Sequence, residues 1–478
     1  MALKHTKICI FVCYINMKPS IPKGTRDFTP SEVNLRDFVK EKIKSNFELF
    51  GFEPIETPSF EKLEVIADKH VSDGEQLIFK ILSNGEKLSK ADLNSLQEQN
   101  YSKFANSISE KALRYDLTVP FSRYVVQHQN EITFPFKRYQ IQTVWRADRP
   151  QYGRFQEFLQ CDADTIGSNS LWQEIELCML YDRIIKDLGL EGVCLRINNR
   201  KILYGFAKLL GFENRFNDFT IILDKLDKIN IEGVVKELAT QNFSKDKIQI
   251  IKEFILLEGA NKFKLEKIRT AFKESKISLD GIDEQNFIID NIEKSGGFES
   301  IDLKFDLSLA RGLSYYTGTI FELTLPNFPE IGSIGGGGRY DNLTANFGKK
   351  NLSGVGISIG FERVLMVLEQ FKLFPKDLKN GVQVLIANFG SKTALICNSI
   401  LKKLRAKGVK SEFYPDDSKL KKQLSYANSK NIEYVVLLGD EELQNEEFVL
   451  KNMNEGSQAN FKISQLESVI LSKLKKLN

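Results

Sequence analysis

The residues best suited to chemistry lie in one predicted β-hairpin. Residues 134–165 alternate between apolar and polar types, as two strands around a turn at 149–153. One face is mostly apolar, with Glu157 as the exception, and is expected to pack against the protein. The other face lacks lysine in a lysine-rich chain; planar Arg and amide groups there suit a small polar ligand, and an ordinary solvated face is the alternative. That face carries Arg138, Gln140, Gln142, Val144 and Arg146 on the first strand, and Arg154, Gln156, Phe158, Gln160, Asp162 and Asp164 on the second.

A second candidate is Arg363, in the stretch Gly360-Phe361-Glu362-Arg363 at the predicted start of a helix. A cation in the first turn of a helix opposes the helix dipole, so the position needs a compensating group. A bound anion ahead of the helix would provide one. An ion pair with Glu362 or another carboxylate is the equally weighted alternative.

Three further stretches stand out by type and spacing. Residues 113–120 read Leu-Arg-Tyr-Asp-Leu-Thr-Val-Pro, and residues 311–316 read Arg-Gly-Leu-Ser-Tyr-Tyr. A core tyrosine pair is the plain interpretation of Tyr315 and Tyr316. The glycines at 335–338 lack the Gly-Lys-Ser/Thr ending of a phosphate-binding loop, so alone they indicate only close backbone approach or a tight turn.

Together these segments resemble the histidyl-tRNA synthetase family of class II aminoacyl-tRNA synthetases. Residues 23–27 with the following helix resemble class II motif 1, Arg146 with residues 154–158 resembles motif 2, and residues 360–363 resemble motif 3. Residues 311–316 and 337–341 resemble two signatures peculiar to the histidine enzyme. One departure is Ser314, where the family usually has Asp. The resemblance runs from residue 20 to the C-terminus, with the motifs in the family's order.

The resemblance implies roles for individual residues. Arg311 and Arg146 are the implied catalytic residues, with Mg²⁺ bridging the phosphates of ATP and no metal held by the protein alone. Glu157 is implied to lie close to that ion. The implied histidine-binding residues are Asp116, Leu117, Thr118, Arg146, Gln160, Asp164, Arg311, Tyr315 and Tyr316, and the implied ATP-binding residues are Arg146, Arg154, Glu157, Phe158 and Arg363.

The implied activity is ATP-dependent ligation of L-histidine to tRNA(His) through a histidyl-adenylate, by a homodimer. The alternative is a catalytically silent paralogue, either a regulatory subunit of histidine biosynthesis or a tRNA sensor. The regulatory paralogue lacks the C-terminal α/β domain and usually the Arg-Gly-x-x-Tyr-Tyr stretch, both of which this chain has. The sequence therefore favours the ligase.

The elements that must position these residues follow from pattern and resemblance. Thr29-Pro30-Ser31-Glu32 predicts a capped helix start, and the two prolines in 52–58 predict an edge strand. The expected fold class is α+β, a mostly antiparallel sheet flanked by helices. The expected N-terminal extension at 1–16 is either disordered or precedes a true start at Met17. The catalytic domain is expected in two parts, 17–199 and 299–372, around a helical insertion at 200–298 that has one strand-like run at 219–223. An anticodon-binding α/β domain with a parallel sheet is expected at 381–478.

Composition fits a globular cytosolic protein and excludes several classes. The chain has 478 residues, 35 Phe and 14 Tyr, which supply ample core and argue against disorder. No apolar run is long enough for a membrane span, and six scattered cysteines do not form a disulfide scaffold. The net charge of +4 leaves a nucleic-acid partner open. A basic cluster between Lys402 and Lys422 suits a solvated face as well as an RNA contact.

Overall fold

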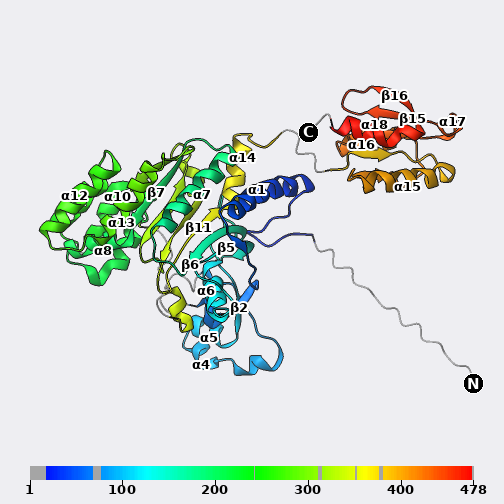
Figure 1. Cartoon of the computed structure of the whole chain (residues 1–478). Helices are drawn as coiled ribbons and strands as arrows, with labels where there is room; N and C mark the ends of the chain where they lie inside the picture. The colour runs from blue at the N-terminus through cyan, green and yellow to red at the C-terminus, as the bar shows by residue number, and fades with distance from the viewer. Residues whose placement is uncertain are drawn as a thin grey trace, which may run out of the picture. The chain divides into compact units, whose positions relative to one another are not determined.

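A computed structural model describes residues 18–67, 77–241, 243–310, 315–349, 352–375 and 381–475 (Figure 1). The chain divides into two compact units, one ending at Phe374 and one beginning at Pro375. The expectations for residues 1–16, Arg311 and Ser314 fall outside the described residues. Within the described part, no helix is both long and apolar enough to cross a membrane.

The first unit is built on an eight-stranded sheet whose order is β1-β5-β6-β11-β10-β9-β7-β8. Only the two outer pairs, β1 with β5 and β7 with β8, are parallel, so the predicted mostly antiparallel sheet is confirmed. The strands are β1 (Glu53–Pro54), β5 (Phe136–Trp145), β6 (Glu157–Ile166), β7 (Val193–Asn199), β8 (Ile301–Phe305), β9 (Thr319–Thr324), β10 (Gly335–Tyr340) and β11 (Gly354–Gly360).

Two long helices pack into the apolar core of this sheet. The helix α1 (Pro30–Leu49) begins as predicted, with Thr29 as N-cap, a capping box to Glu32 and Pro at the first position. Its buried residues Val39, Ile43 and Phe47 share a core with α7 (Trp172–Leu188) and with the apolar sides of β6 and β11. The predicted edge strand is also confirmed, because β1 lies at the end of the sheet.

Smaller elements complete the surroundings of the sheet. The helix α6 (Thr118–Gln127) follows a three-stranded sheet of β2 (Phe60–Lys62), β3 (Lys80–Ile81) and β4 (Lys111–Leu113). The helix α14 (Phe361–Gln370) leaves directly from β11. Three short helices, α2 (Leu63–Ile66), α4 (Leu93–Gln97) and α5 (Tyr101–Ser107), lie along the chain between β2 and β4.

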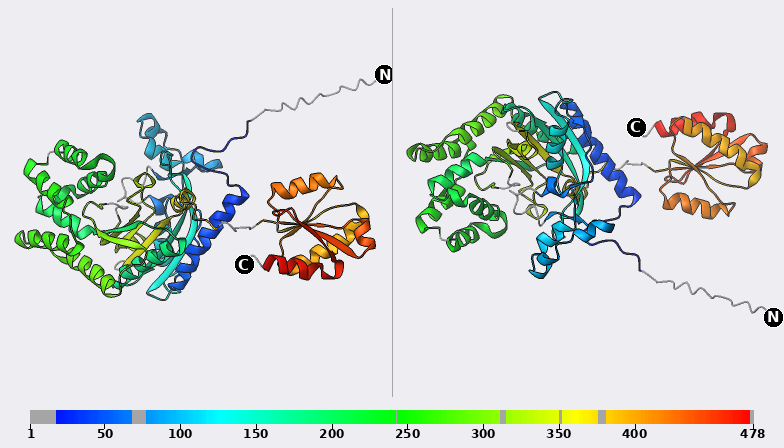
Figure 2. Two further views of the ribbon diagram at one scale, coloured as in Figure 1. Left: turned by 90° about the horizontal axis from the view of Figure 1, so that it is seen from above. Right: turned by 90° about the horizontal axis from the view of Figure 1, so that it is seen from below.

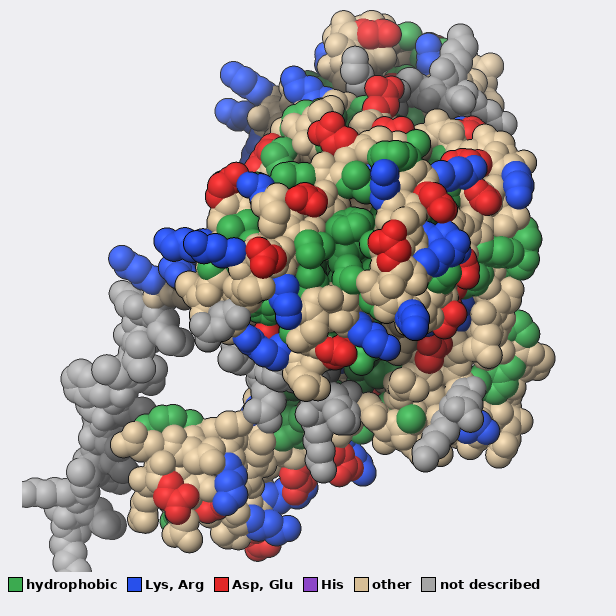
Figure 3. All heavy atoms as spheres, turned by 90° about the vertical axis from the view of Figure 1, so that its left-hand side faces the viewer, with side chains coloured by type: hydrophobic (Ala, Val, Ile, Leu, Met, Phe, Trp, Pro, Cys, Tyr) green, Lys and Arg blue, Asp and Glu red, His purple; other side chains and the backbone are tan. Residues whose placement is uncertain are grey.

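Helices fill the chain between β7 and β8, and they gather at one end of the sheet (Figure 2). The strand predicted at 219–223 is wrong, because these residues belong to a helix. Phe219, Ile222 and Leu223 are buried while Ile221 is 47% exposed, which is a helical period. Figure 3 shows acidic and basic side chains interspersed on the face of this unit turned towards the viewer. The helices are α8 (Arg200–Leu209), α9 (Phe216–Leu223), α10 (Leu226–Thr240), α11 (Lys245–Ile255), α12 (Asn261–Glu274) and α13 (Asp280–Lys294).

The second unit is a five-stranded sheet in the order β13-β12-β14-β15-β16, with its own helices. Its first three strands are parallel, as predicted, but β15 and β16 add an antiparallel pair that the sequence analysis did not anticipate. The strands are β12 (Val384–Ile386), β13 (Ser411–Phe413), β14 (Tyr434–Leu437), β15 (Glu447–Asn452) and β16 (Gln458–Lys462), and the helices are α15 (Ser391–Ala406), α16 (Leu420–Ser429), α17 (Asp440–Gln444) and α18 (Leu466–Lys475).

Candidate functional site

Three buried carboxylates, Asp116, Asp162 and Asp164, meet around Arg138 and are called the carboxylate cluster below. The register of β5 with β6 places Arg138 opposite Asp164, so both side chains lie on the same face of the sheet. The Arg138 Nη2 atom lies 2.6 Å from Asp164 Oδ2, and the Tyr340 hydroxyl donates to Asp164 Oδ1 at 2.7 Å. The strand parity read from the sequence is therefore confirmed for the residues of β5 and β6.

Asp116 reaches the cluster from the loop that starts α6. Its Oδ1 atom accepts a hydrogen bond from the Val119 amide at 3.2 Å. Leu117 is the N-cap of α6, and its carbonyl accepts a hydrogen bond from Arg138 Nη2 at 3.5 Å. Thr118, the first residue of the helix, is largely buried beside them. The backbone of 116–119 thus presents its polar groups to the same spot as β5 and β6.

Burial dominates the electrostatics of the cluster. It raises the pKa of Asp116 to about 6 and the pKa of Asp162 to about 7, since a charged carboxylate loses its hydration there. Burial also raises the pKa of Asp164, although Arg138 opposes that shift. Arg138 acts on all three carboxylates and Arg146 acts on Asp116, so two guanidinium groups face three carboxylates, which suits a cationic ligand.

Several buried polar atoms of the site have no hydrogen-bond partner among the described residues. They are Asp116 Oδ2, Asp162 Oδ1, Gln160 Oε1, and both Nε and Nη1 of Arg138. The amide nitrogen of Gln160 does have one, since it donates to Ser358 Oγ at 3.1 Å. Buried polar groups are almost always satisfied in folded proteins, so orphans that gather at one place indicate a polar ligand.

The glycine-rich stretch forms the floor of the site as part of the sheet. A Cβ atom at Gly356 would lie 1.9 Å from Asp164 Oδ1, and one at Gly338 would lie 2.9 Å from the ring of Tyr316. The glycines 335–338 make up most of β10, so they form a strand without side chains. The close backbone approach expected from the sequence is confirmed at these positions.

The two tyrosines cover this floor. The rings of Tyr315 and Tyr316 are 4.8 Å apart, and the ring of Tyr315 meets that of Tyr340 edge-on at 6.1 Å. Both are partly buried and pack beside the buried residues around α6. The structure therefore brings Tyr315 and Tyr316 together with Tyr340, the partner of Asp164, whereas Arg311 is outside the described residues.

The residues expected at ATP lie further along the hairpin. The Arg146 guanidinium lies 5.2 Å from the centre of the Phe158 ring, and its Nε donates to the Tyr115 carbonyl at 3.0 Å. Arg154 lies outside β6, in the loop before it, and its Nη1 is 3.9 Å from an oxygen of Asp148. The parity argument therefore does not extend to Arg154, since the strand begins only at Glu157.

Glu157 does not lie with Arg146 and Phe158, the other residues of the hairpin expected at ATP. Its carboxylate accepts a hydrogen bond from Trp145 Nε1 at 2.7 Å, and it is exposed. The register pairs Glu157 with Trp145 and Phe158 with Val144, so Glu157 lies on the face opposite to Phe158. This agrees with the sequence alternation, which places Glu157 as the exception on the apolar face.

Arg363 joins the start of α14 to two loops. Its Nη1 donates to the Ser333 carbonyl at 2.7 Å and its Nε to the Gly153 carbonyl at 3.1 Å. Glu362 instead accepts two hydrogen bonds from Arg36 of α1, at 2.5 and 2.8 Å. The part of the alternative that pairs Arg363 with Glu362 is therefore wrong, while a pair with another carboxylate is not tested.

Sequence reasoning missed Arg138, Asp162, Tyr340 and Ser358 as members of the site. A signal was available for Arg138 and Asp162, because both stand in the polar row of the hairpin. Tyr340 and Ser358 come from β10 and β11, and their contacts follow from a strand order that alternation cannot supply.

A cleft of about 760 Å³ lies between β7, β8, β9 and helices α9 to α12. Arg196, one of the residues that line it, is paired with Asp306 at 2.9 Å and with Glu322 at 3.0 Å. None of the orphaned polar atoms belongs to a residue that lines this cleft within the described chain. The carboxylate cluster is therefore the stronger candidate for a polar ligand.

Comparison with known proteins agrees with these features. Residues 24–364 match the family model of histidyl-tRNA synthetase, and residues 383–473 match that of an anticodon binding domain. The chain is 51% identical to a histidine–tRNA ligase of Christiangramia forsetii and 48% identical to one of Flavobacterium johnsoniae, in each case over 95% of this chain and 99% of the relative. A crystal structure of histidyl-tRNA synthetase from Nostoc sp. PCC 7120 superposes with a TM-score of 0.77 at 29% identity, covering 96% of this chain and all of that one.

Proposed function

The chain belongs to the histidyl-tRNA synthetase family, and we propose that its carboxylate cluster is the part that selects histidine. The protein is a histidine–tRNA ligase: it joins L-histidine to tRNA(His) at the expense of ATP, through a histidyl-adenylate. The observation that carries the site assignment is the group of orphaned polar atoms on Asp116, Asp162, Gln160 and Arg138. A ligand with an ammonium group and an imidazole ring supplies the donors and acceptors that these atoms lack.

Selection of histidine follows from that match. Asp116 accepts from the ammonium group, while Gln160 and Asp164 face the imidazole ring, which Tyr315 and Tyr316 enclose. An apolar amino acid would leave these groups buried and unpaired, which rejects such a competitor by about 10⁴-fold or more. Tyr340 fixes Asp164 for this task through the hydrogen bond to its Oδ1.

In the first step, a carboxylate oxygen of histidine attacks the α-phosphorus of ATP, and pyrophosphate leaves. Negative charge develops on the phosphoryl oxygens, so placed guanidinium groups supply most of the catalysis. Arg146 and Arg311 take that role, with Arg311 also contacting the carboxylate of histidine. Phe158 stacks on adenine, beside the Arg146 guanidinium. Arg154 and Arg363 hold the outer phosphates, Arg363 after exchanging carbonyl partners for phosphate.

In the second step, the terminal ribose hydroxyl of the tRNA attacks the carbonyl carbon of the adenylate. The bond between that carbon and the phosphate oxygen breaks, and AMP leaves. A phosphate oxygen of the adenylate accepts the proton of the hydroxyl group, so the step needs no protein base. The role of the protein here is to keep both reacting groups aligned.

The described residues do not fit a Mg²⁺ site made by the protein alone. No group of three or more His, Cys, Asp or Glu among the described residues could hold a metal ion. Glu157, the carboxylate expected near the ion, accepts a hydrogen bond from Trp145 on the sheet face opposite to Phe158. Mg²⁺ commonly binds through substrate phosphates with few protein ligands, so we propose that it enters with ATP.

The second unit is proposed to bind the anticodon of tRNA(His). Five lysines of the basic cluster are exposed and have no carboxylate within 4 Å among the described residues, which leaves them available to phosphates. Two other members are occupied, since Arg405 donates to the Ser411 carbonyl and Lys407 lies 3.9 Å from Glu467. The five are Lys402, Lys403, Lys419, Lys421 and Lys422.

We further propose a homodimer in the cytoplasm, where tRNA is charged for translation. The support for the dimer is β1 at the edge of the large sheet, next to α1 with Val33 41% and Leu49 66% exposed. An edge strand has unpaired backbone groups that a second copy can cover. Light scattering on the purified protein tests this: a mass of twice 54.6 kDa supports it, and a monomer overturns it.

The activity is tested by ATP–pyrophosphate exchange that depends on histidine. Substituting Arg311→Ala should lower the exchange rate by about 10³-fold, since a fixed cation at a developing phosphoryl charge is worth that much. Arg183→Ala is the matched control, because Arg183 is a half-exposed arginine whose ion pair with Asp187 lies one turn away on α7. Exchange by the Arg311 variant at the rate of the control would refute the role. A wild-type protein without any exchange would instead support the silent paralogue.

A further inference from the structure

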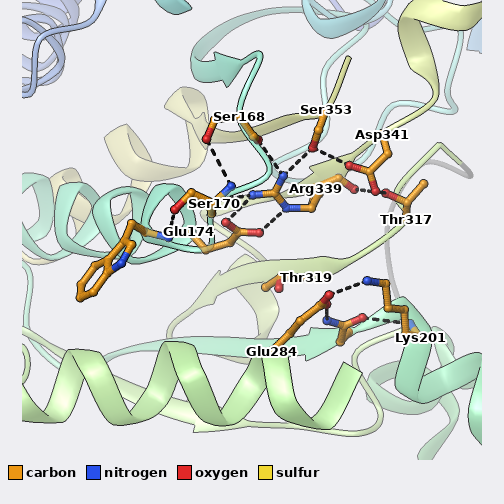
Figure 4. A network of polar contacts seen from close by, with 12 residues as sticks. Ser168, Ser170, Glu174, Lys201, Glu284, Thr317, Thr319, Arg339, Asp341 and Ser353 are labelled. Atoms are coloured by element: carbon orange, nitrogen blue, oxygen red, sulfur yellow. Dashed lines mark hydrogen bonds and ion pairs between the residues drawn. The ribbon is translucent and has the colours of Figure 1, made fainter. Parts of the chain in front are cut away.

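The segment that follows the two tyrosines is anchored at Thr317. The Thr317 amide donates to the Arg339 carbonyl at 2.8 Å, and its hydroxyl donates to Asp341 Oδ2 at 2.5 Å (Figure 4). The next residues are held elsewhere: the Arg200 amide donates to the Gly318 carbonyl, and Gln285 donates to the Thr319 hydroxyl. Thr317 therefore fixes the chain directly after Tyr316 through its side chain, and it is called the anchor of the two tyrosines below.

Asp341 is itself fixed from behind. Its Oδ1 accepts from the Ser353 hydroxyl at 2.5 Å, and that hydroxyl accepts from Arg339 Nη1 at 2.5 Å. Arg339 in turn binds Glu174 of α7 through Nε and Nη2, at 2.5 and 2.6 Å. Figure 4 shows this chain running from α7 to Thr317. A chain of polar contacts with charged ends holds each member in one orientation.

The order of residues 338–341 explains how one short stretch serves both faces of the sheet. Successive residues of β10 point to opposite faces. Gly338 leaves room for the ring of Tyr316, and Tyr340 donates to Asp164 on the same face. Arg339 points to the other face, where it meets Glu174, and Asp341 at the end of the strand reaches Thr317.

We infer that Asp341 and Thr317 are positioning residues of the histidine site: they hold Tyr315 and Tyr316 against the glycine floor, beside Asp164. This inference rests on the proposed histidine site. Among the described residues, no hydrogen bond or ion pair joins Thr317 or Asp341 to Phe158 of β6 or to Arg146 of the loop before it. The anchor therefore acts on histidine binding and leaves the ATP side of the site unaffected.

The test compares Thr317→Val with Thr317→Ser in the full-length protein. Valine has nearly the shape of threonine but cannot donate to Asp341, whereas serine keeps the hydroxyl. In histidine-dependent pyrophosphate exchange, Thr317→Val should raise the KM for histidine about tenfold, the usual effect of losing one hydrogen bond to a charged group. The KM for ATP should stay within about twofold, and Thr317→Ser should restore the KM for histidine.

A matched control separates positioning from a general loss of stability. Ser95 is buried in the same unit, and its hydroxyl also donates to a carboxylate, Asp92 Oδ2, at 2.7 Å. Ser95→Ala should leave the KM for histidine unchanged. Asp341→Asn is a second variant that should raise the KM for histidine, in case Thr317→Val unfolds. An unchanged KM in both variants, or equal rises for histidine and ATP, would overturn the inference. Wild-type protein without histidine-dependent exchange would refute the underlying site assignment instead.

Discussion

Two buried groups of charges lie on opposite faces of the same sheet, and they differ in how well they are paired. On one face, Arg339 and Glu174 form a two-fold hydrogen-bonded ion pair, and both Arg339 Nη atoms also donate to backbone carbonyls or Ser353. On the other face, Arg138 faces the carboxylate cluster with two of its nitrogen atoms unpartnered among the described residues.

Complete or incomplete pairing of a buried charge separates the folded framework from the ligand site. A buried charge with all partners in place is part of the folded framework, and removing one partner costs stability. A buried charge without partners costs stability as it stands, and a ligand that supplies the partners recovers that free energy. Both faces carry arginine and carboxylate, so residue type alone does not separate the two roles.

The largest expected effect is on the scaffold face. Glu174→Gln leaves the Arg339 charge buried opposite a neutral group, so the free energy of unfolding should fall by about 3 to 5 kcal/mol. The control is Glu293→Gln, because Glu293 forms an exposed pair with Lys262 at 2.7 Å. Urea denaturation measures both variants. A loss no larger for Glu174→Gln than for the control would show that the Arg339–Glu174 pair does not stabilise the fold.

The next effect is on the site face and on function. Asp164→Asn removes the charge opposite the imidazole ring, and kcat/KM for histidine should fall about 100-fold. Asp306→Asn serves as the control, since Asp306 is buried but fully engaged with Arg196 and Ser308. The control should lose stability and keep its kcat/KM. The reverse pattern would show that the roles of the two aspartates are exchanged.

The smallest effect depends on pH. Burial raises the pKa of Asp162 to about 7 in the folded protein, against about 4 in an unfolded chain. The folded state then binds the proton more tightly than the unfolded state, so this group destabilises the fold increasingly as the pH rises from about 4 through 7. Asp162→Asn abolishes that dependence.

The unfolding temperature of Asp162→Asn minus that of wild type should therefore be larger at about pH 8 than at about pH 5. Thermal unfolding at the two pH values without ligand provides the measurement. The same difference at both values would mean that Asp162 is not a buried charge of the kind described.

Much of the site was readable from the sequence because a strand alternates with a period of two. Once the hairpin was placed, Phe158, Gln160 and Asp164 had to share a face, and the structure confirms it. The capped start of α1 was readable for a similar reason, since a capping box is a local signal. Local periodicity and local caps need no knowledge of the remaining chain.

Other parts could not be read in this way. The contact of Tyr340 with Asp164 joins residues 176 positions apart, and depends on the order of β6, β11 and β10. The run Phe219–Leu223 has strand-like residues, but packing among α8 to α11 makes it a helix. The pairing of Glu362 with Arg36 likewise follows from the approach of α1 to α14, which no local pattern encodes.

A crystal structure of the protein with histidine and ATP tests directly whether the carboxylate cluster binds histidine. We expect the imidazole ring within hydrogen-bond distance of Gln160 and Asp164, and the ammonium group beside Asp116, so that the orphaned atoms gain partners. Histidine bound elsewhere, for instance in the cleft around Arg196, with Asp116 Oδ2 and Gln160 Oε1 still unpartnered, would contradict it.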